Sequence, residues 1–225
     1  ANEVFRGDQG DDLLIGNGGD DSITAAGGDD TVYAGGGTDS VDGGDGDDQL
    51  HGQGGRDTIT GGAGNDFIDG GTGSDFIYGD DLAGTLSGND TITGSAGADF
   101  IAAGMGDDIV YGGNDNDTIF GEDGQDTIFG QGGDDVINGG TGDDTIIWKQ
   151  DGADVIDGTD GRDQVEVRGT SGVDTIAVGQ TGSTLTVTGR GSTLNLPNAM
   201  QDFANGLEEL IINGGNGADV ITIAD

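Results

Sequence analysis

The chain has 225 residues, 52 of which are glycine, and its 44 acidic and 6 basic residues give a formal net charge of −38. The absence of cysteine excludes disulfide scaffolds and thiolate metal sites, and no run approaches the ~18 apolar residues of a membrane-spanning helix. Nucleic acid is excluded as a partner, because binding to a phosphate backbone depends on cationic contacts.

Aspartate dominates the acidic residues, because only five of the 44 are glutamate and 39 are therefore aspartate. A merely solvating acidic segment would use glutamate as freely. The short aspartate side chain, in contrast, stays near its own backbone and suits turns. A chain rich in both aspartate and glycine therefore predicts tight turns whose carboxylates face a cation.

One aspartate recurs in steps of nine residues, with a single step of fifteen between two regular series, and a large aliphatic residue follows it two positions later. Glu3 and Phe5 form a degenerate earlier copy. The regular aspartates are Asp12, Asp21, Asp30, Asp39, Asp48, Asp57, Asp66, Asp75, Asp90, Asp99, Asp108, Asp117, Asp126, Asp135 and Asp144, followed less regularly by Asp154, Asp163 and Asp174. The chain is therefore a repeat array.

Three units carry the repeat in full: GGAGNDFID (61–69), GGTGSDFIY (70–78) and GGTGDDTII (139–147). They resemble the RTX (repeats-in-toxin, hemolysin-type) calcium-binding family, whose repeat is GGxGxDxUx with U a large aliphatic residue. The resemblance covers about residues 3–177 and returns at GGNGADVIT (214–222). It implies an all-β fold, the parallel β-roll.

The residues agree with that fold. Six residues of each unit suit a turn, because glycine tolerates positive φ, and the last three, such as Phe67-Ile68-Asp69, suit a short strand. Two units would make one 18-residue coil, so residues 1–177 predict about nine coils with an insert at 79–87. Residues 178–213 are then a β-rich cap or spacer, and 214–225 begin a further repeat.

The segment after the regular repeats has its own pattern. From Gln164 onward it alternates polar and apolar residues, which predicts strands, with a hairpin around Gly189-Arg190-Gly191. Residues 198–210 could form a short helix with Met200, Phe203, Leu207 and Leu210 on one face. Trp148 is expected at the junction with the roll.

The resemblance implies that each calcium ion lies between turns of successive coils, bound by the repeat aspartates and by turn carbonyls. Nine turns in each of two rows leave about sixteen sites at most, whose ~32 positive charges would offset most of the net charge. The implied carboxylate ligands are the eighteen aspartates named above and Asp219. The implied carbonyl ligands include those of Gly44, Gly46, Gly62, Gly64, Gly71, Gly73, Gly113, Gly140 and Gly142.

Other features support no enzyme. His51, the sole histidine, occupies an outward strand position, and adjacent acidic pairs are so frequent that none marks a catalytic site. Asp80 lies outside the motif and is expected to have little effect when replaced. Outward apolar residues predict a ladder that could contact a protein or glycan partner, or the chain's own 164–213 segment: Phe67, Phe76, Tyr78, Phe100, Ile109, Tyr111, Phe120, Phe129 and Ile147.

The sequence thus predicts a non-enzymatic calcium-binding module, monomeric as a fragment, of a large secreted or surface protein of a Gram-negative bacterium. It would fold on binding calcium after export, and the resemblance implies a type I exporter. Two alternatives stay open. The chain could be an accessory roll beside the catalytic domain of an extracellular enzyme, or a segment of an adhesin or surface layer that binds a partner.

Overall fold

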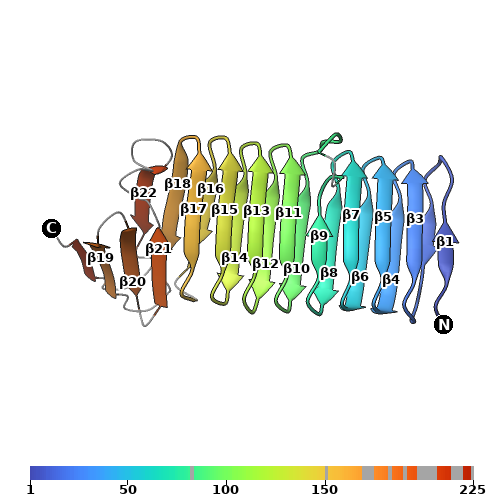
Figure 1. The fold of residues 1–225 in the computed structure, drawn as a ribbon, viewed down its shortest axis with the longest axis horizontal. Coiled ribbons are helices and arrows are strands. Elements are labelled where there is room, and N and C mark those ends of the chain that lie inside the picture. The colour runs from blue at the N-terminus through green and yellow to red at the C-terminus, as the bar shows by residue number, and fades with distance from the viewer. Residues whose placement is uncertain are drawn as a thin grey trace.

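The computed structural model describes residues 1–81, 84–149, 152–168, 175–181, 184–189, 192–196, 207–213 and 220–223. Within these ranges every regular element is a β-strand, and the strands form two sheets that face each other along a rod (Figure 1).

The 13-stranded sheet contains, in spatial order, β1 (Val4–Arg6), β3 (Ser22–Gly27), β5 (Ser40–Asp45), β7 (Thr58–Ala63), β9 (Phe76–Tyr78), β11 (Phe100–Met105), β13 (Thr118–Asp123), β15 (Val136–Thr141), β17 (Val155–Asp160), β21 (Ser192–Leu196), β20 (Thr184–Gly189), β19 (Thr175–Thr181) and β23 (Val220–Ile223). The 10-stranded sheet contains β2 (Leu13–Ile15), β4 (Thr31–Gly37), β6 (Gln49–Gly55), β8 (Phe67–Thr72), β10 (Thr91–Ala96), β12 (Ile109–Asn114), β14 (Thr127–Gly132), β16 (Thr145–Trp148), β18 (Asp163–Arg168) and β22 (Leu207–Asn213).

Strands β1 to β18 alternate between the two sheets, so each pair of consecutive strands completes one coil and the nine coils stack in parallel register. In β5, Val41 pairs with Ile23 on one side and with Ile59 on the other. Because side chains alternate across a strand, one aliphatic residue per unit points between the sheets. From Ile23 onward these residues are almost fully buried and form one continuous core. The predicted parallel β-roll is confirmed.

The insert lies in the fifth coil and preserves the alternation of the strands. Strand β8 pairs with β10 in the same parallel register as elsewhere, although the partners are 24 residues apart instead of 18. The backbone bonds of Gly79 and Ser87 follow the regular pattern. The six additional residues are therefore 81–86, and Asp80 still belongs to the repeat.

Beyond the ninth coil both sheets continue. Strand β22 pairs in parallel with β18, and β21 pairs in parallel with β17. The predicted hairpin is confirmed, because β20 and β21 are antiparallel with Gly189 opposite Ser192. The predicted helix is wrong for Leu207–Leu210, which lie in β22: pairing with the available edge of β18 outweighs a weak helical periodicity. The rest of that prediction, 198–206, lies outside the described residues.

The predicted apolar ladder is wrong as a single surface. Phe76, Phe100 and Phe120 lie on the 13-stranded sheet and form a row of tilted rings, whereas Tyr111 and Phe129 stack 4.8 Å apart on the 10-stranded sheet. The two groups are on opposite faces, because consecutive units alternate between the sheets.

Ile147, predicted to point outward and be exposed, is instead only 4% exposed. Its register neighbours are Phe129 and Glu166, and Glu166 accepts a 2.7 Å hydrogen bond from Arg168. The isoleucine is thus flanked in the sheet by an aromatic residue on one side and by a residue of this ion pair on the other. Trp148, next to it, is also buried and pairs with Val167 in the last coil.

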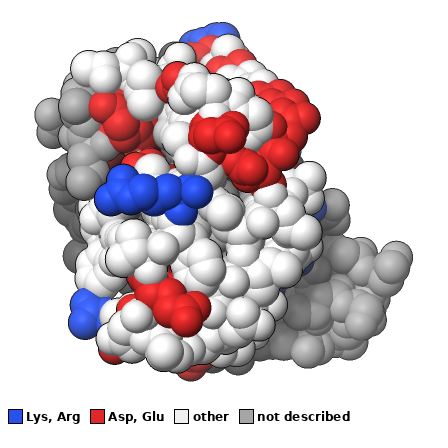
Figure 2. All heavy atoms as spheres, turned by 90° about the vertical axis from the view of Figure 1, so that its right-hand side faces the viewer, with Lys and Arg blue, Asp and Glu red and all other residues white. Residues whose placement is uncertain are grey.

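Figure 2 looks onto the end of the rod formed by β1 and β2. Acidic atoms gather toward the top and the bottom of this view, where the turns lie, and neutral atoms cover most of the middle. No helix in the described residues has the length and apolarity needed to cross a membrane.

Removal of residues 169–225 tests whether the C-terminal segment caps the roll. The shortened chain would expose the edges of β17 and β18, so it is expected to associate through these edges and to fray in its last coils. Light scattering measures the association, and the fluorescence of Trp148, the one tryptophan, reports on the last coils. A monomeric product with unchanged fluorescence would identify the segment as a spacer.

Candidate metal centre

Each nine-residue unit places one carboxylate inside a turn. In the unit 61–69, positions one to three (61–63) end strand β7, positions four to six (64–66) form the turn and positions seven to nine (67–69) begin strand β8, so the predicted division into a six-residue turn and a three-residue strand is wrong. Side chains at positions six, eight and one point inward by alternation, so Asp66 and Ile68 are both buried. The carboxylate at position six therefore lies at the end of the aliphatic core.

One oxygen of each carboxylate ties two successive coils together. The backbone N–H of Asp30 donates to Oδ1 of Asp48 at 2.8 Å, and that of Asp108 donates to Oδ1 of Asp126 at 2.9 Å. These bonds join the carboxylates in two rows. The first row runs through Asp12, Asp30, Asp48, Asp66, Asp90, Asp108, Asp126, Asp144 and Asp163, and the second through Asp21, Asp39, Asp57, Asp75, Asp99, Asp117, Asp135 and Asp154.

The other carboxylate oxygen, Oδ2, is buried without a hydrogen-bond partner in most units. This holds for Asp21, Asp30, Asp39, Asp48, Asp57, Asp66, Asp75, Asp90, Asp99, Asp108, Asp117, Asp126, Asp144 and Asp163. A buried anionic oxygen without a partner is costly, and a regular series of them indicates a group that would compensate the charge.

A backbone oxygen of the next coil faces the same space as Oδ2. If Gly112 carried a Cβ, that atom would lie 2.6 Å from Oδ2 of Asp117 and 2.6 Å from the carbonyl oxygen of Gly130. A carboxylate oxygen and a carbonyl oxygen thus converge beside the first glycine of the unit. Sequence reasoning missed this position-one carbonyl, although the repeated glycine marks it.

The predicted carbonyl residues at positions two and four lie where successive turns touch. Gly62 and Gly64 have φ of +122° and +121°, and a Cβ on either would collide with the carbonyl oxygen of Gly44 or Gly46 in the preceding coil. Glycine is required there both for the positive φ and for the close approach. Gly71, Gly73, Gly113, Gly140 and Gly142 also have positive φ.

Burial makes the ionised carboxylates unfavourable in this setting. Burial, together with the charge of neighbouring row carboxylates and against the lowering by the backbone N–H bond, raises the pKa of Asp66 and Asp117 to about 8 and that of Asp108 and Asp126 to about 7. Near neutral pH the rows therefore attract a positive charge, either protons or a cation.

The donor set fits a hard cation. Among the described residues no three His, Asp or Glu side chains gather around one point, so a metal ion would take most of its ligands from turn carbonyls. Carboxylate and carbonyl oxygens are the ligands that Ca²⁺ selects. The ion pairs of Arg162 with Asp143 and of Arg168 with Glu166 lie outside the rows.

Comparison with protein families agrees with the geometry. The model of the RTX calcium-binding nonapeptide repeat matches six overlapping segments: 6–41, 16–50, 42–77, 51–86, 84–119 and 111–146. These segments span more than half of the chain, so the chain belongs to the RTX calcium-binding repeat family. It is a calcium-binding repeat module. A search of curated proteins finds no match.

Some predicted ligands stand apart from the regular rows. Asp12 is only half-buried at the first coil, and Asp174 and Asp219 lie outside the described residues. Ala25, Ala34 and Ala103 replace the first glycine of their turns and are fully buried. Their methyl groups occupy the side-chain position that, at Gly112, would lie only 2.6 Å from Oδ2 of Asp117.

The structure argues against the expectation that replacing Asp80 has little effect. Its side chain is 4% exposed, and its Oδ2 accepts a 2.6 Å hydrogen bond from the N–H of Met105. Because Asp80 occupies position two of its unit, it lies against the next coil instead of in the exposed insert. Asp45, at an exposed position three, is a better control residue.

The raised pKa values predict how a calcium-free roll responds to pH. Since the row carboxylates bind protons more tightly when folded than when unfolded, the metal-free roll gains stability as the pH falls from about 8 toward the ordinary aspartate pKa near 4. Circular dichroism in metal-free buffer at pH 8 and pH 5 measures this, and more β structure is expected at pH 5. More β structure at pH 8 would contradict the burial of ionised carboxylates.

Replacement of one row carboxylate tests the ligand set. Asp126→Ala removes a carboxylate that the predicted ligand set shares between the ions on both sides of its turn, so the calcium midpoint of folding is expected to rise. Two ions at tenfold their dissociation constants represent about 3 kcal/mol. Asp45→Ala removes the same charge from a position where the next coil already has Ala63, and it is expected to change little. Equal effects would mean that only total charge matters.

Proposed function

We propose that this chain is a structural, non-enzymatic module of a large secreted or surface protein of a Gram-negative bacterium, and that it folds when many calcium ions bind to its turns after export. The observation that carries the proposal is the double row of buried carboxylates, most with one oxygen that no hydrogen bond satisfies. Carbonyl oxygens of the adjacent coil face that oxygen, as at Gly130.

The thin core makes folding dependent on that cation. Each unit of nine residues contributes one large aliphatic side chain to the core, and it also buries one carboxylate. A chain with a net charge of −38 repels itself when compact, and so small an apolar core offsets little of the ordering entropy. Calcium between the coils would neutralise the rows and bind successive turns to each other.

The proposed ligands of one ion illustrate the arrangement. Between two turns of the first row, Asp108 and Asp126 supply carboxylate oxygens, and the carbonyl groups at positions one, two and four of the same turns supply the others. The bound calcium would supply the positive charge that the buried carboxylates lack. The chain's own contribution is to hold these oxygens in a fixed stack, by the bond from the N–H of Asp108 to Oδ1 of Asp126.

The proposed location outside the cell follows from the calcium affinity that such sites typically have. Extracellular calcium modules typically bind at about 10⁻⁴–10⁻³ M, so the sites would be empty in the cytosol and filled outside the cell. An unfolded chain is suited to passage through a narrow exporter, and family membership makes a type I exporter the proposed route. Folding outside the cell would then prevent return.

An accessory roll beside an extracellular enzyme, or a segment of an adhesin, would use the same calcium chemistry. These alternatives differ from the main proposal only in the neighbouring domains. A partner-binding face is less supported, because the aromatic residues are divided between two opposite sheets. His51 supports no chemistry either, since its ring stacks 4.9 Å from Tyr33 on the outer surface.

Calcium titration tests the proposal directly. In excess chelator at neutral pH the chain is expected to give the circular dichroism spectrum of a coil, and added calcium is expected to produce a steep transition to a β-rich spectrum. A dozen sites at tenfold their dissociation constants would contribute on the order of 17 kcal/mol. Magnesium at the same concentration is the control, because it dehydrates reluctantly and demands stricter geometry. A β-rich spectrum in chelator would refute calcium-driven folding.

A further inference from the structure

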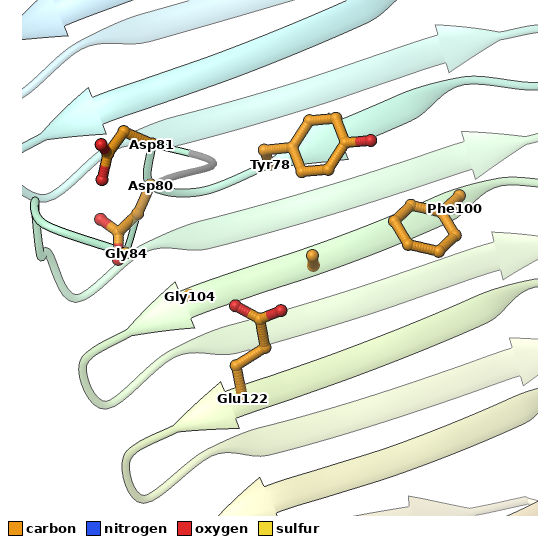
Figure 3. Close-up of a pocket in the computed structure, with 8 residues that line it drawn as sticks. Tyr78, Asp80, Asp81, Gly84, Phe100, Gly104 and Glu122 are labelled. Carbon is orange, nitrogen blue, oxygen red and sulfur yellow. The ribbon is translucent and has the colours of Figure 1, made fainter.

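A pocket of about 340 Å³ lies on the outer face of the 13-stranded sheet, beside the insert of the fifth coil. Figure 3 shows Tyr78 and Phe100 at one end of the pocket and the carboxylates of Asp80, Asp81 and Glu122 toward the other. The pocket opens on the outer face, whereas the carboxylate rows lie inside the turns, and Asp80 lies near enough to Asp90 and Asp108 of the first row for its charge to raise their pKa values.

Two small residues of β11 create the pocket. Ala102 pairs with Tyr78 on one side and with Phe120 on the other, so a methyl group stands between two large rings. Gly104 pairs with Glu122 in the next coil, and a Cβ on Gly104 would collide with the carboxylate of Asp80. The small residues at these two positions of β11 therefore leave a slot that ends between two acidic residues.

Asp80 gives the slot a buried negative group. Its Oδ2 accepts the N–H of Met105, but its Oδ1 is buried without a hydrogen-bond partner. Glu122 extends from a residue with φ of +76°, a conformation that is unfavourable for glutamate.

The slot is not built as a metal cage. Asp81 is engaged in holding the insert, because its Oδ1 accepts the N–H groups of Thr85 and Leu86 and its Oδ2 accepts the hydroxyl of Thr85. Among the described side chains no group of three metal ligands is found. Two carboxylates remain for a ligand, and the rest of the surface is aromatic or aliphatic.

We propose that this slot binds an organic cation, an alkyl chain that ends in an ammonium or guanidinium group. The cationic head lies between Asp80 and Glu122, and the alkyl chain lies over Ala102 against the rings of Tyr78 and Phe100. Carboxylates and aromatic faces both attract such a head group, whereas a hydrated calcium ion gains nothing from the rings. The volume is sufficient for a lysine or arginine side chain or for a small diamine.

The test uses the full chain in saturating calcium, after circular dichroism has shown that it is folded, so its failure leaves the calcium proposal intact. Isothermal titration is carried out with Nα-acetyl-arginine methylamide and with putrescine. Binding of the arginine compound alone would identify a peptide side chain as the source, and binding of putrescine alone would identify a free amine. Saturable binding of at least one is expected.

Three variants localise the binding. Glu122→Gln and Asp80→Asn are each expected to weaken it about tenfold, as for the loss of a charged hydrogen bond. Asn at position 80 keeps an acceptor for the N–H of Met105. Ala102→Phe is expected to abolish binding by filling the slot, since Phe120 shows that the sheet accepts this side chain. Asp45→Asn is the matched charge control.

Two results would overturn the proposal. One is the absence of saturable binding by both compounds, or binding that Ala102→Phe leaves unchanged. The other is a loss of one bound calcium ion per chain in Asp80→Asn, which would assign the pocket to the metal.

Discussion

The structure depends on the way each repeat aspartate divides its two oxygens. Oδ1 accepts the backbone N–H of the preceding coil, at 2.7 to 3.0 Å throughout both rows, and so sets the register of the stack. Oδ2 is thereby held inside the turn, in most units without a partner. Glutamate could not replace aspartate here, because its longer side chain would not keep one oxygen on the neighbouring backbone while placing the other beside the first glycine.

This arrangement also explains the glycine content. Successive turns are in direct backbone contact. A Cβ at position four would therefore collide with a carbonyl oxygen of the preceding coil, as a Cβ on Gly64 would with that of Gly46. The contact brings many carbonyl oxygens together with one carboxylate per turn. Without a cation this set of buried oxygens is unfavourable, but it suits a hard cation such as calcium. The residues that make the metal-free fold only marginally stable therefore also make its stability depend on calcium.

The nine-residue period was sufficient to predict the two sheets, the nine coils and the two rows of carboxylates, because each unit forms nearly the same local structure. Prediction failed where neighbours in space decide the outcome. Leu207 and Leu210 are in a strand because the edge of β18 is available, and Ile147 is covered by residues of the adjacent coils. The role of Asp80 was missed because the insert hid its position in the repeat.

Position two of the turn shows how a strict repeat can still acquire new sites. In the 10-stranded sheet, residues with side chains alternate there with glycine: Asn17, Gly35, Gln53, Gly71, Ser95, Gly113 and Gln131, all with positive φ. A side chain at this position lies against the next turn, and the glycine on either side leaves it room. When position two carries a side chain in alternate coils, two such side chains therefore lie on either side of the glycine in the coil between them. In the 13-stranded sheet, Asp80 and Glu122 likewise lie on either side of Gly104, although of the two only Glu122 has positive φ, and the charge that they bring together is a consequence of the same close stacking that requires glycine elsewhere.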